Sequence, residues 1–263
     1  MIIATRECGT ARRALAIASA VCFVLGLGCD DAGGTQPPDA GSDDIFPLAV
    51  GDHWVYDETG YDPDAPAATR TIRREVVDFV AMDFENDTAG TVSVFVVDET
   101  FPSGGGDPRR AYDLDDGTVV ARKRLEILES GTGAAKQTVD YEPALLQIDR
   151  SRTSAGDNWD DDFEELTVSV PAQEDDGEWT LEYLYEILEP ATVIVPAGTF
   201  DCAVVQRTCQ SGYPGVDEVS PEVIVLYLAP GVGKVKEVTD TGTGAIITAE
   251  LVEYEIVAPG GGV

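Results

Sequence analysis

Apolar and polar side chains alternate residue by residue along several stretches of the sequence, and this period of two constrains the fold more than any other feature. In 178–188, one side of the alternation consists of Trp179, Leu181, Tyr183, Tyr185 and Ile187. Successive side chains of a strand point to opposite faces of a sheet, so the pattern predicts strands with one buried and one solvated face. The segment 119–128 alternates in the same way, and its predicted solvated face carries Arg122, Arg124 and Glu126.

Further runs rich in β-branched and aromatic residues predict additional strands. We expect these at 53–58, 70–84, 91–101, 110–115, 136–141, 164–170, 191–195, 199–208, 222–229, 234–240 and 245–257. Glycine and proline at Asp115-Asp116-Gly117 and Pro230-Gly231 supply turns between neighbouring runs. The predicted fold class is therefore all-β, with a single, mainly antiparallel domain. It would be a curved sheet, half-barrel or barrel, with a sandwich as the alternative.

The N-terminal region has the build of an export signal. Residues 1–13 carry Arg6, Arg12 and Arg13, and residues 14–28 contain no charge. A basic stretch before an apolar one is typical of a secretory signal helix, and this apolar run is shorter than the ~20 residues that span a membrane. The junction Leu25-Gly26-Leu27-Gly28-Cys29 resembles a bacterial lipoprotein lipobox, which implies that Cys29 is acylated. Cleavage and release without a lipid is the alternative.

These features divide the chain into four predicted parts. Residues 30–44 are mostly Asp, Gly, Pro, Ser and Thr, which bury too little apolar surface to offset the entropy of ordering. We expect a lipoprotein signal peptide at 1–28, the acylated Cys29 and a disordered acidic tether at 29–45, an antiparallel β domain at 46–257, and a flexible tail at 258–263.

The chain is strongly acidic, with 17 basic and 49 acidic residues and a formal net charge of −32. Binding of nucleic acid is excluded as a function class, because phosphate contacts need clustered Lys and Arg. Basic-patch binding to anionic lipid headgroups is disfavoured for the same reason.

Two cysteines, Cys202 and Cys209, fall within the predicted domain. An exported protein meets an oxidising compartment, where the two could form a disulfide. If 199–208 is one unbroken strand, however, the seven-residue spacing separates them and puts them on opposite faces. The alternative is two free thiols, with Cys202 as a small core residue.

Three short blocks bracket most of the predicted domain. They read FPLxxGxxWxY at 46–56, VPAGTFxC at 195–202 and APGVGxVK at 229–236. The blocks resemble segments of a family of uncharacterised bacterial lipoproteins and exported β proteins. The resemblance implies an exported β domain with no established activity. The residues of the blocks themselves indicate turns and do not indicate catalysis.

Gly-Asp-x-Trp occurs twice, at 51–54 and at 156–159. One interpretation is a duplication of two halves of about a hundred residues each. The other is that each tryptophan anchors the start of a strand directly after a Gly-Asp turn.

The sequence carries no recognisable catalytic motif, and we expect no enzyme activity. His53 is the only histidine, which excludes sites with several histidine ligands, and it falls at a predicted strand start. Phosphate-binding loops, dinucleotide-binding fingerprints and nucleophile elbows are absent from the sequence. Neighbouring carboxylates are expected by chance in so acidic a chain and do not by themselves indicate a glycosidase.

A calcium site is the one cofactor hypothesis that the sequence offers. Hard oxygen ligands gather in what we expect to be a short loop, which contains Asp157, Asp160, Asp161, Asp162 and Glu164. Calcium takes six to eight such oxygens, but the spacing matches no EF-hand loop. Solvated acidic side chains are the alternative interpretation, and no other cofactor is expected.

Together these features predict a monomeric protein, exported and lipid-anchored in the cell envelope through Cys29. We expect a structural or interaction module that contacts an unknown protein. The alternatives are a carrier that holds a lipid or other hydrophobic ligand in a curved-sheet cavity, and a calcium-binding surface module.

The acylation of Cys29 is tested by Cys29→Ser. Because each buried methylene of an acyl chain contributes about 0.8 kcal/mol to membrane binding, removing the attachment atom should move the protein from the membrane to the soluble fraction. Cell fractionation measures the change. A variant that still sediments with membranes would refute the anchor.

Overall fold

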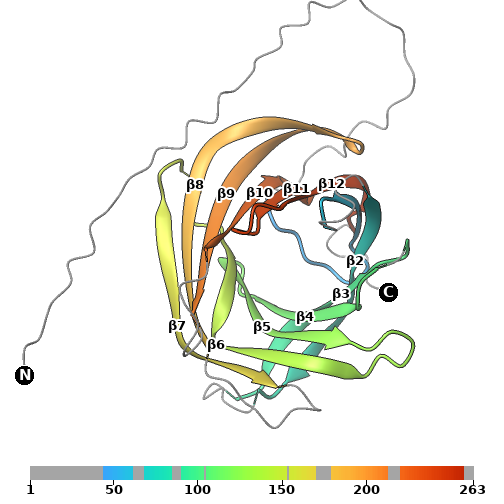
Figure 1. Ribbon diagram of the computed structural model, residues 1–263, viewed down its shortest axis with the longest axis vertical. Coiled ribbons are helices and arrows are strands. Elements are labelled where there is room, and N and C mark those ends of the chain that lie inside the picture. The colour runs from blue at the N-terminus through green and yellow to red at the C-terminus, as the bar shows by residue number, and fades with distance from the viewer. Residues whose placement is uncertain are drawn as a thin grey trace, which may run out of the picture. The chain divides into compact units, whose positions relative to one another are not determined.

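Twelve antiparallel β-strands succeed one another along the part of the chain that the structure, a computed structural model, describes (Figure 1). This part comprises residues 44–61, 68–84, 90–103, 105–152, 154–169, 179–212 and 220–257. The strands are β1 (His53–Thr59), β2 (Thr69–Met82), β3 (Val92–Thr100), β4 (Arg109–Asp115), β5 (Val119–Leu128), β6 (Ala135–Asp149), β7 (Asn158–Ser169), β8 (Trp179–Val195), β9 (Gly198–Gly212), β10 (Glu222–Ala229), β11 (Gly233–Asp240) and β12 (Ile246–Glu255). None of the described segments is a helix long and apolar enough to cross a membrane.

The strands pair in sequence order, and the ring closes where β1 pairs with both β2 and β12. Every strand therefore has an antiparallel neighbour on each side, and the sheet forms a closed barrel. Among the described residues, the shortest ladder lies between β6 and β7, where three residue pairs, from Thr138–Ser169 to Asp140–Thr167, connect the strands. The predicted all-β antiparallel fold class is confirmed, in its barrel form.

The predicted strands are confirmed to within a few residues, with two exceptions. Strands β6 and β7 are longer than expected, because they extend through 142–149 and 158–163. The segments 178–188 and 191–195 form one strand, β8, with a bulge between Leu188 and Ala191. The bulge contains Pro190, which lacks the N–H needed for a regular ladder.

The chain enters the barrel through a short piece, Asp44–Leu48, which we call the plug segment (blue in Figure 1). Phe46 is buried among side chains of one large interior cluster that includes Ile148, Tyr185 and Leu228. Leu48 packs against both large clusters. The plug segment thus joins the two halves of the core from inside the ring.

The hairpin of β8 and β9 extends beyond the ring and arches over β11 and β12 (orange in Figure 1). The backbone N–H of Ala197 at its tip donates a hydrogen bond to the carbonyl oxygen of Leu251, with an N···O distance of 3.0 Å. The ring of Phe200 meets that of Tyr254 edge-on, with centroids 6.1 Å apart. This hairpin therefore adds a second layer to one side of the barrel.

Asp52 ties the start of β1 to the end of β12. Its fully buried carboxylate accepts hydrogen bonds from the backbone N–H groups of Ala49 (2.8 Å) and Val257 (2.7 Å). Burial raises the pKa of Asp52, although these two hydrogen bonds act in the opposite direction. The preceding Gly51 has φ +101°, which disfavours other residues at this turn.

The second Gly-Asp pair makes the same turn. Gly51 and Asp52 exchange backbone hydrogen bonds with Val76, and Gly156 and Asp157 exchange equivalent bonds with Ile187. In each turn the aspartate carboxylate also accepts the N–H of the residue three positions earlier. In each copy the Gly-Asp turn leads directly into a strand, β1 or β7, as the turn interpretation predicts, and in the first copy Trp54 is buried at the strand start.

Replacing Asp52 tests the importance of this tie. Asp52→Ala leaves the N–H groups of Ala49 and Val257 without an acceptor, so we expect the free energy of unfolding to fall by about 2–3 kcal/mol. Asp52→Asn retains one acceptor oxygen, so its free energy of unfolding should lie between that of Asp52→Ala and that of the parent. Urea unfolding measures both, and equal stabilities of the three proteins would contradict this role.

Candidate binding cavity

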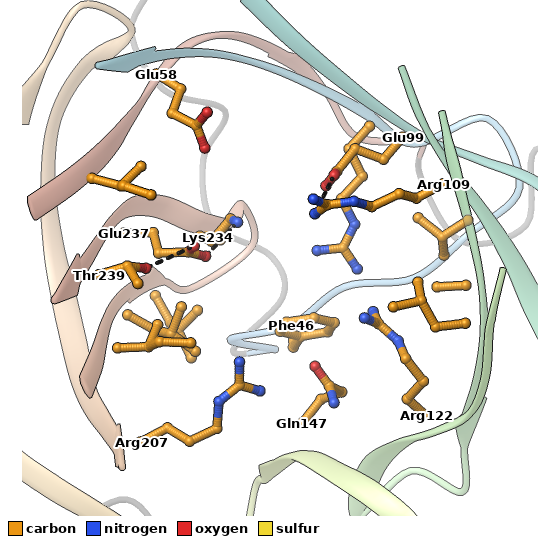
Figure 2. Close-up of a pocket in the computed structure, with 18 of the residues that line it drawn as sticks. Phe46, Glu58, Glu99, Arg109, Arg122, Gln147, Arg207, Lys234, Glu237 and Thr239 are labelled. Carbon is orange, nitrogen blue, oxygen red and sulfur yellow. Dashed lines mark hydrogen bonds and ion pairs between the residues drawn. The ribbon is translucent and has the colours of Figure 1, made fainter. Parts of the chain in front are cut away.

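The barrel encloses a cavity of about 360 Å³ (Figure 2). Residues from ten of the twelve strands line it, and Phe46 of the plug segment lies among them. Glu58, Arg70, Glu99 and Arg109 lie near the end of the ring at which β1 and β3 terminate, here called the far end. The plug segment enters at the opposite end, so Phe46 forms the cavity floor.

The charge of the cavity lining is opposite in sign to that of the chain as a whole. Six basic and four acidic residues line it, in a chain with 17 basic and 49 acidic residues. The basic residues are Arg70, Arg74, Arg109, Arg122, Arg207 and Lys234, and the acidic residues are Glu58, Glu99, Glu222 and Glu237. Cationic side chains are thus concentrated inside the ring.

Three ion pairs lie on the cavity wall. They are Arg70–Glu58 at 2.5 Å, Arg109–Glu99 at 3.3 Å and Lys234–Glu237 at 2.7 Å. Arg70 also donates to the carbonyl oxygen of Gly105, which links the far end of β2 to the segment before β4.

Two further arginines share one buried carboxylate behind the lining. Asp113 is fully buried and accepts two hydrogen bonds from Arg122, at 2.8 and 3.2 Å. Arg74 approaches the same carboxylate to 3.6 Å. Burial lowers the pKa of Arg122, but the charge and hydrogen bonds of Asp113 outweigh burial and leave this pKa above its ordinary value. One negative charge therefore serves two guanidinium groups.

Arg207 differs from the other five cationic residues of the lining. It takes part in no ion pair among the described residues, and its buried Nε has no hydrogen-bond partner there. Its guanidinium carbon lies 5.6 Å from the centre of the Tyr183 ring. Arg207 therefore faces the cavity with unused hydrogen-bonding capacity.

The pKa of Glu237 reflects the positive character of this interior. Burial alone would raise it, yet Lys234, Arg207 and Arg74 together bring it below its ordinary value. The interior thus favours negative charge on a group that burial would otherwise protonate.

One wall of the cavity is apolar. Ile224, Leu226 and Leu228 face it from alternate positions of β10. Arg207 on β9 is the register partner of Ile224, so the apolar wall begins directly beside the guanidinium. The cavity therefore combines a cationic part with an adjoining hydrophobic surface.

Sequence reasoning placed Arg122 on a solvated strand face, and this was wrong. The pairing of β5 with β6 shifts register between Arg122 and Arg124. A bulge of this kind changes which residues share a face. Arg122 and Leu125 both line the cavity as a result. Arg74 and Arg207 were not singled out either, since a charged residue within an alternating run normally indicates solvent.

The predicted lipidation residue, Cys29, lies outside the described residues. The predicted calcium ligands Asp160, Asp161, Asp162 and Glu164 lie in β7, where the structure describes the backbone alone. The sequence suggested a short loop there, but the backbone is a strand. Asp157 accepts the N–H of Ser154 in the turn before it.

Cys202 and Cys209 are free thiols on one continuous strand, β9, in agreement with the second of the two alternatives for this pair. The strand does not turn between them, as bridging would require. Burial raises the pKa of Cys202 to about 11, with a smaller contribution from Asp201. Burial also raises the pKa of Cys209. Protonated, buried thiols are poor nucleophiles.

His53 lies on the opposite strand face from the buried Trp54 and is remote from both thiols in the pairing order. Its ring nitrogens are 4.0 Å from a carboxylate oxygen of Glu253 and 3.9 Å from one of Glu255. His53 thus lies at a strand start, as the sequence predicted, and is not among the residues that line the cavity.

The three sequence blocks meet in one place and serve the architecture. Trp54 Nε1 donates to the carbonyl oxygen of Val232 at 2.6 Å, and the Tyr56 hydroxyl donates to that of Lys234 at 2.9 Å. The N–H of Gly231 donates to the carbonyl oxygen of Asp44. The first block is thus hydrogen-bonded to the third, the third also holds Asp44 of the plug segment, and the second forms the tip of the β8–β9 hairpin.

The shared carboxylate of Asp113 can be tested by Asp113→Ala. This change leaves Arg74 and Arg122 without their buried counter-ion, so we expect the free energy of unfolding to fall by about 3–5 kcal/mol. Asp98→Ala is the matched control, because Asp98 pairs with the half-exposed Arg110 and should cost about 1 kcal/mol or less. Chemical denaturation compares them, and equal effects would argue against a special role of Asp113.

No protein-family profile matches the sequence, and no curated protein matches it. Among solved structures, a presumed exported protein with a YmcC-like fold from Bacteroides fragilis shares 14% identity at a TM-score of 0.49. A presumed lipoprotein from Parabacteroides distasonis shares 16% at a TM-score of 0.46. Each alignment covers 80% of this chain and 98% of the other. At these TM-scores, no function is transferred from either protein.

Proposed function

We propose that this chain is an exported, lipid-anchored protein of the cell envelope whose barrel holds a small ligand in its interior, without catalytic activity of its own. The observation that carries the proposal is the cavity of about 360 Å³ inside the ring. Ligand pockets commonly measure ~300–1,000 Å³, so this volume falls at the small end of that range. The anchor part of the proposal depends on Cys29 and the N-terminal sequence.

The lining supports ligand binding over a purely structural module. Protein interiors are normally close-packed, and unfilled space forfeits dispersion contacts. Burial of charged groups also costs free energy unless they are well paired. A module selected for stability alone would gain from apolar side chains at Arg207 and its neighbours, whereas this chain keeps charges around open space.

The lining also restricts the kind of ligand that the barrel could carry. A wholly apolar ligand would cover Arg207 and the wall ion pairs without replacing their contacts with water, which is unfavourable. The apolar wall of β10 nevertheless offers contact for a hydrocarbon group. A ligand with both a polar and an apolar part fits the cavity best.

Filling the cavity tests the proposal. In Leu226→Trp, a larger side chain would occupy the space beside the apolar wall, and Leu184→Trp, at a half-exposed position of β8, is the control. Both are made in the full chain carrying Cys29→Ser, so that no attached acyl group competes. We expect at least one of octanol, octanoate and octyltrimethylammonium to raise the melting temperature of the parent and the control, and none to raise that of Leu226→Trp.

Two results would count against ligand binding in the barrel. One is a folded parent whose melting temperature responds to none of the three compounds. The other is an equal response in Leu226→Trp, which would place the binding elsewhere on the protein.

A further inference from the structure

Among the described residues, Arg207 is the basic residue of the cavity lining that takes part in no ion pair. The other five basic residues of the lining each have an acidic partner: Glu58, Glu99, Glu237 or the shared Asp113. Arg207 has no such partner within the described ranges, and its buried Nε is unbonded there; the buried Nη2 of Arg74 is also without a hydrogen bond, but Arg74 has the ion pair with Asp113. A buried donor without a protein acceptor is costly, so binding of an acceptor in the cavity beside Arg207 would be favourable.

The surroundings of Arg207 show what kind of acceptor fits. Figure 2 shows Arg207 and Arg122 extending toward Phe46 from different sides of the cavity, with Gln147 between them. Gln147 adds an amide that can donate a hydrogen bond to the same position. Arg122 and Arg74 share a single carboxylate, so the positive charge near the floor is only partly neutralised. The lowered pKa of Glu237 agrees with a positive potential here.

The hydrophobic surface beside Arg207 extends in one direction. From the register partner Ile224, the apolar wall continues through Leu226 to Leu228 along β10. Glu222, the remaining acidic residue of the lining, lies two positions beyond Ile224 toward the far end. A hydrocarbon group on the wall can therefore be contacted without reaching Glu222.

We propose that the barrel selects a small anionic amphiphile, whose single acidic headgroup binds Arg207 near Gln147 and the cavity floor while its short hydrocarbon part packs on Ile224, Leu226 and Leu228. This proposal depends on the proposed function, since it names the class of ligand for the same cavity. Carboxylate and phosphate headgroups share the required chemistry, because both accept paired hydrogen bonds from a guanidinium. The cavity of about 360 Å³ limits the ligand to a compact molecule, since this volume equals about a dozen waters at ~30 Å³ each.

Calorimetric titration of the full chain carrying Cys29→Ser tests the headgroup. The probes are octanoate, octyl phosphate, octanol and inorganic phosphate. Because hydrogen bonds to charged groups are stronger than neutral ones, we expect at least one of the two anionic octyl compounds to bind about tenfold or more tightly than octanol. Octyl phosphate should also exceed inorganic phosphate about tenfold, since the latter cannot use the apolar wall.

Substitution of Arg207 identifies the residue responsible. In Arg207→Met, the preference for the anionic compound over octanol should fall to about one, while octanol affinity remains. Arg110→Met is the matched control, because Arg110 alternates with the cavity-lining Arg109 and Ala111 on β4 and pairs with Asp98. If Arg207→Met fails to fold, Arg207→Lys replaces it; this variant should retain a reduced preference for the anion.

The outcomes separate the two proposals. If octanol binds the parent as tightly as both anions, or Arg207→Met keeps the anion preference, the headgroup assignment is overturned and the barrel remains a ligand-binding module. If inorganic phosphate matches octyl phosphate, the site takes a free anion and the amphiphile assignment is overturned. If no octyl compound binds the folded parent, the proposed function itself is wrong.

Discussion

The width of a twelve-stranded ring is the constraint on which the rest of this structure depends. Barrel diameter grows with strand number, and about eight strands already give an interior that side chains just fill. With twelve strands, inward residues from opposite walls leave space between them. The chain fills part of that space with the plug segment and with long arginine side chains. What remains is the cavity, which follows from the strand count before any particular residue is considered.

Most of the fold could be predicted from the sequence, because one solvated face per strand leaves a period-two signal and the turns need Gly and Pro. The closure of the sheet could not, since pairing of β1 with β12 depends on residues that are about 200 positions apart. The bulges at Arg122 and Pro190 also escaped prediction, because register depends on cross-strand neighbours that no local pattern reveals. The cavity residues were missed for the same reason. A charged residue in an alternating strand is interpreted as solvent-facing unless it is known that the sheet closes into a ring with an interior.

The sequence blocks and the cavity have separate roles. Trp54, Tyr56 and Gly231 hold the plug segment and the neighbouring turn through hydrogen bonds to backbone groups, which explains why these blocks contain Gly, Pro and aromatic residues and little charge. The side chains that face the open cavity come largely from outside the blocks. Similar blocks in two chains would therefore indicate a shared architecture and leave the ligand undetermined.

The plug segment has a mechanical consequence. Any force that reaches the domain through the chain preceding Asp44 is delivered first to this segment, before it reaches a strand of the ring. Arg150 resists such a pull, because it holds Asp44, the carbonyl oxygen of Phe46 and Asp115 at once. Displacement of Phe46 would remove the floor beside Arg207 while the ladder from β1 to β12 stayed paired. The contacts of Arg150, and not the ladder of the ring, are thus the first to bear a force from the N-terminal side.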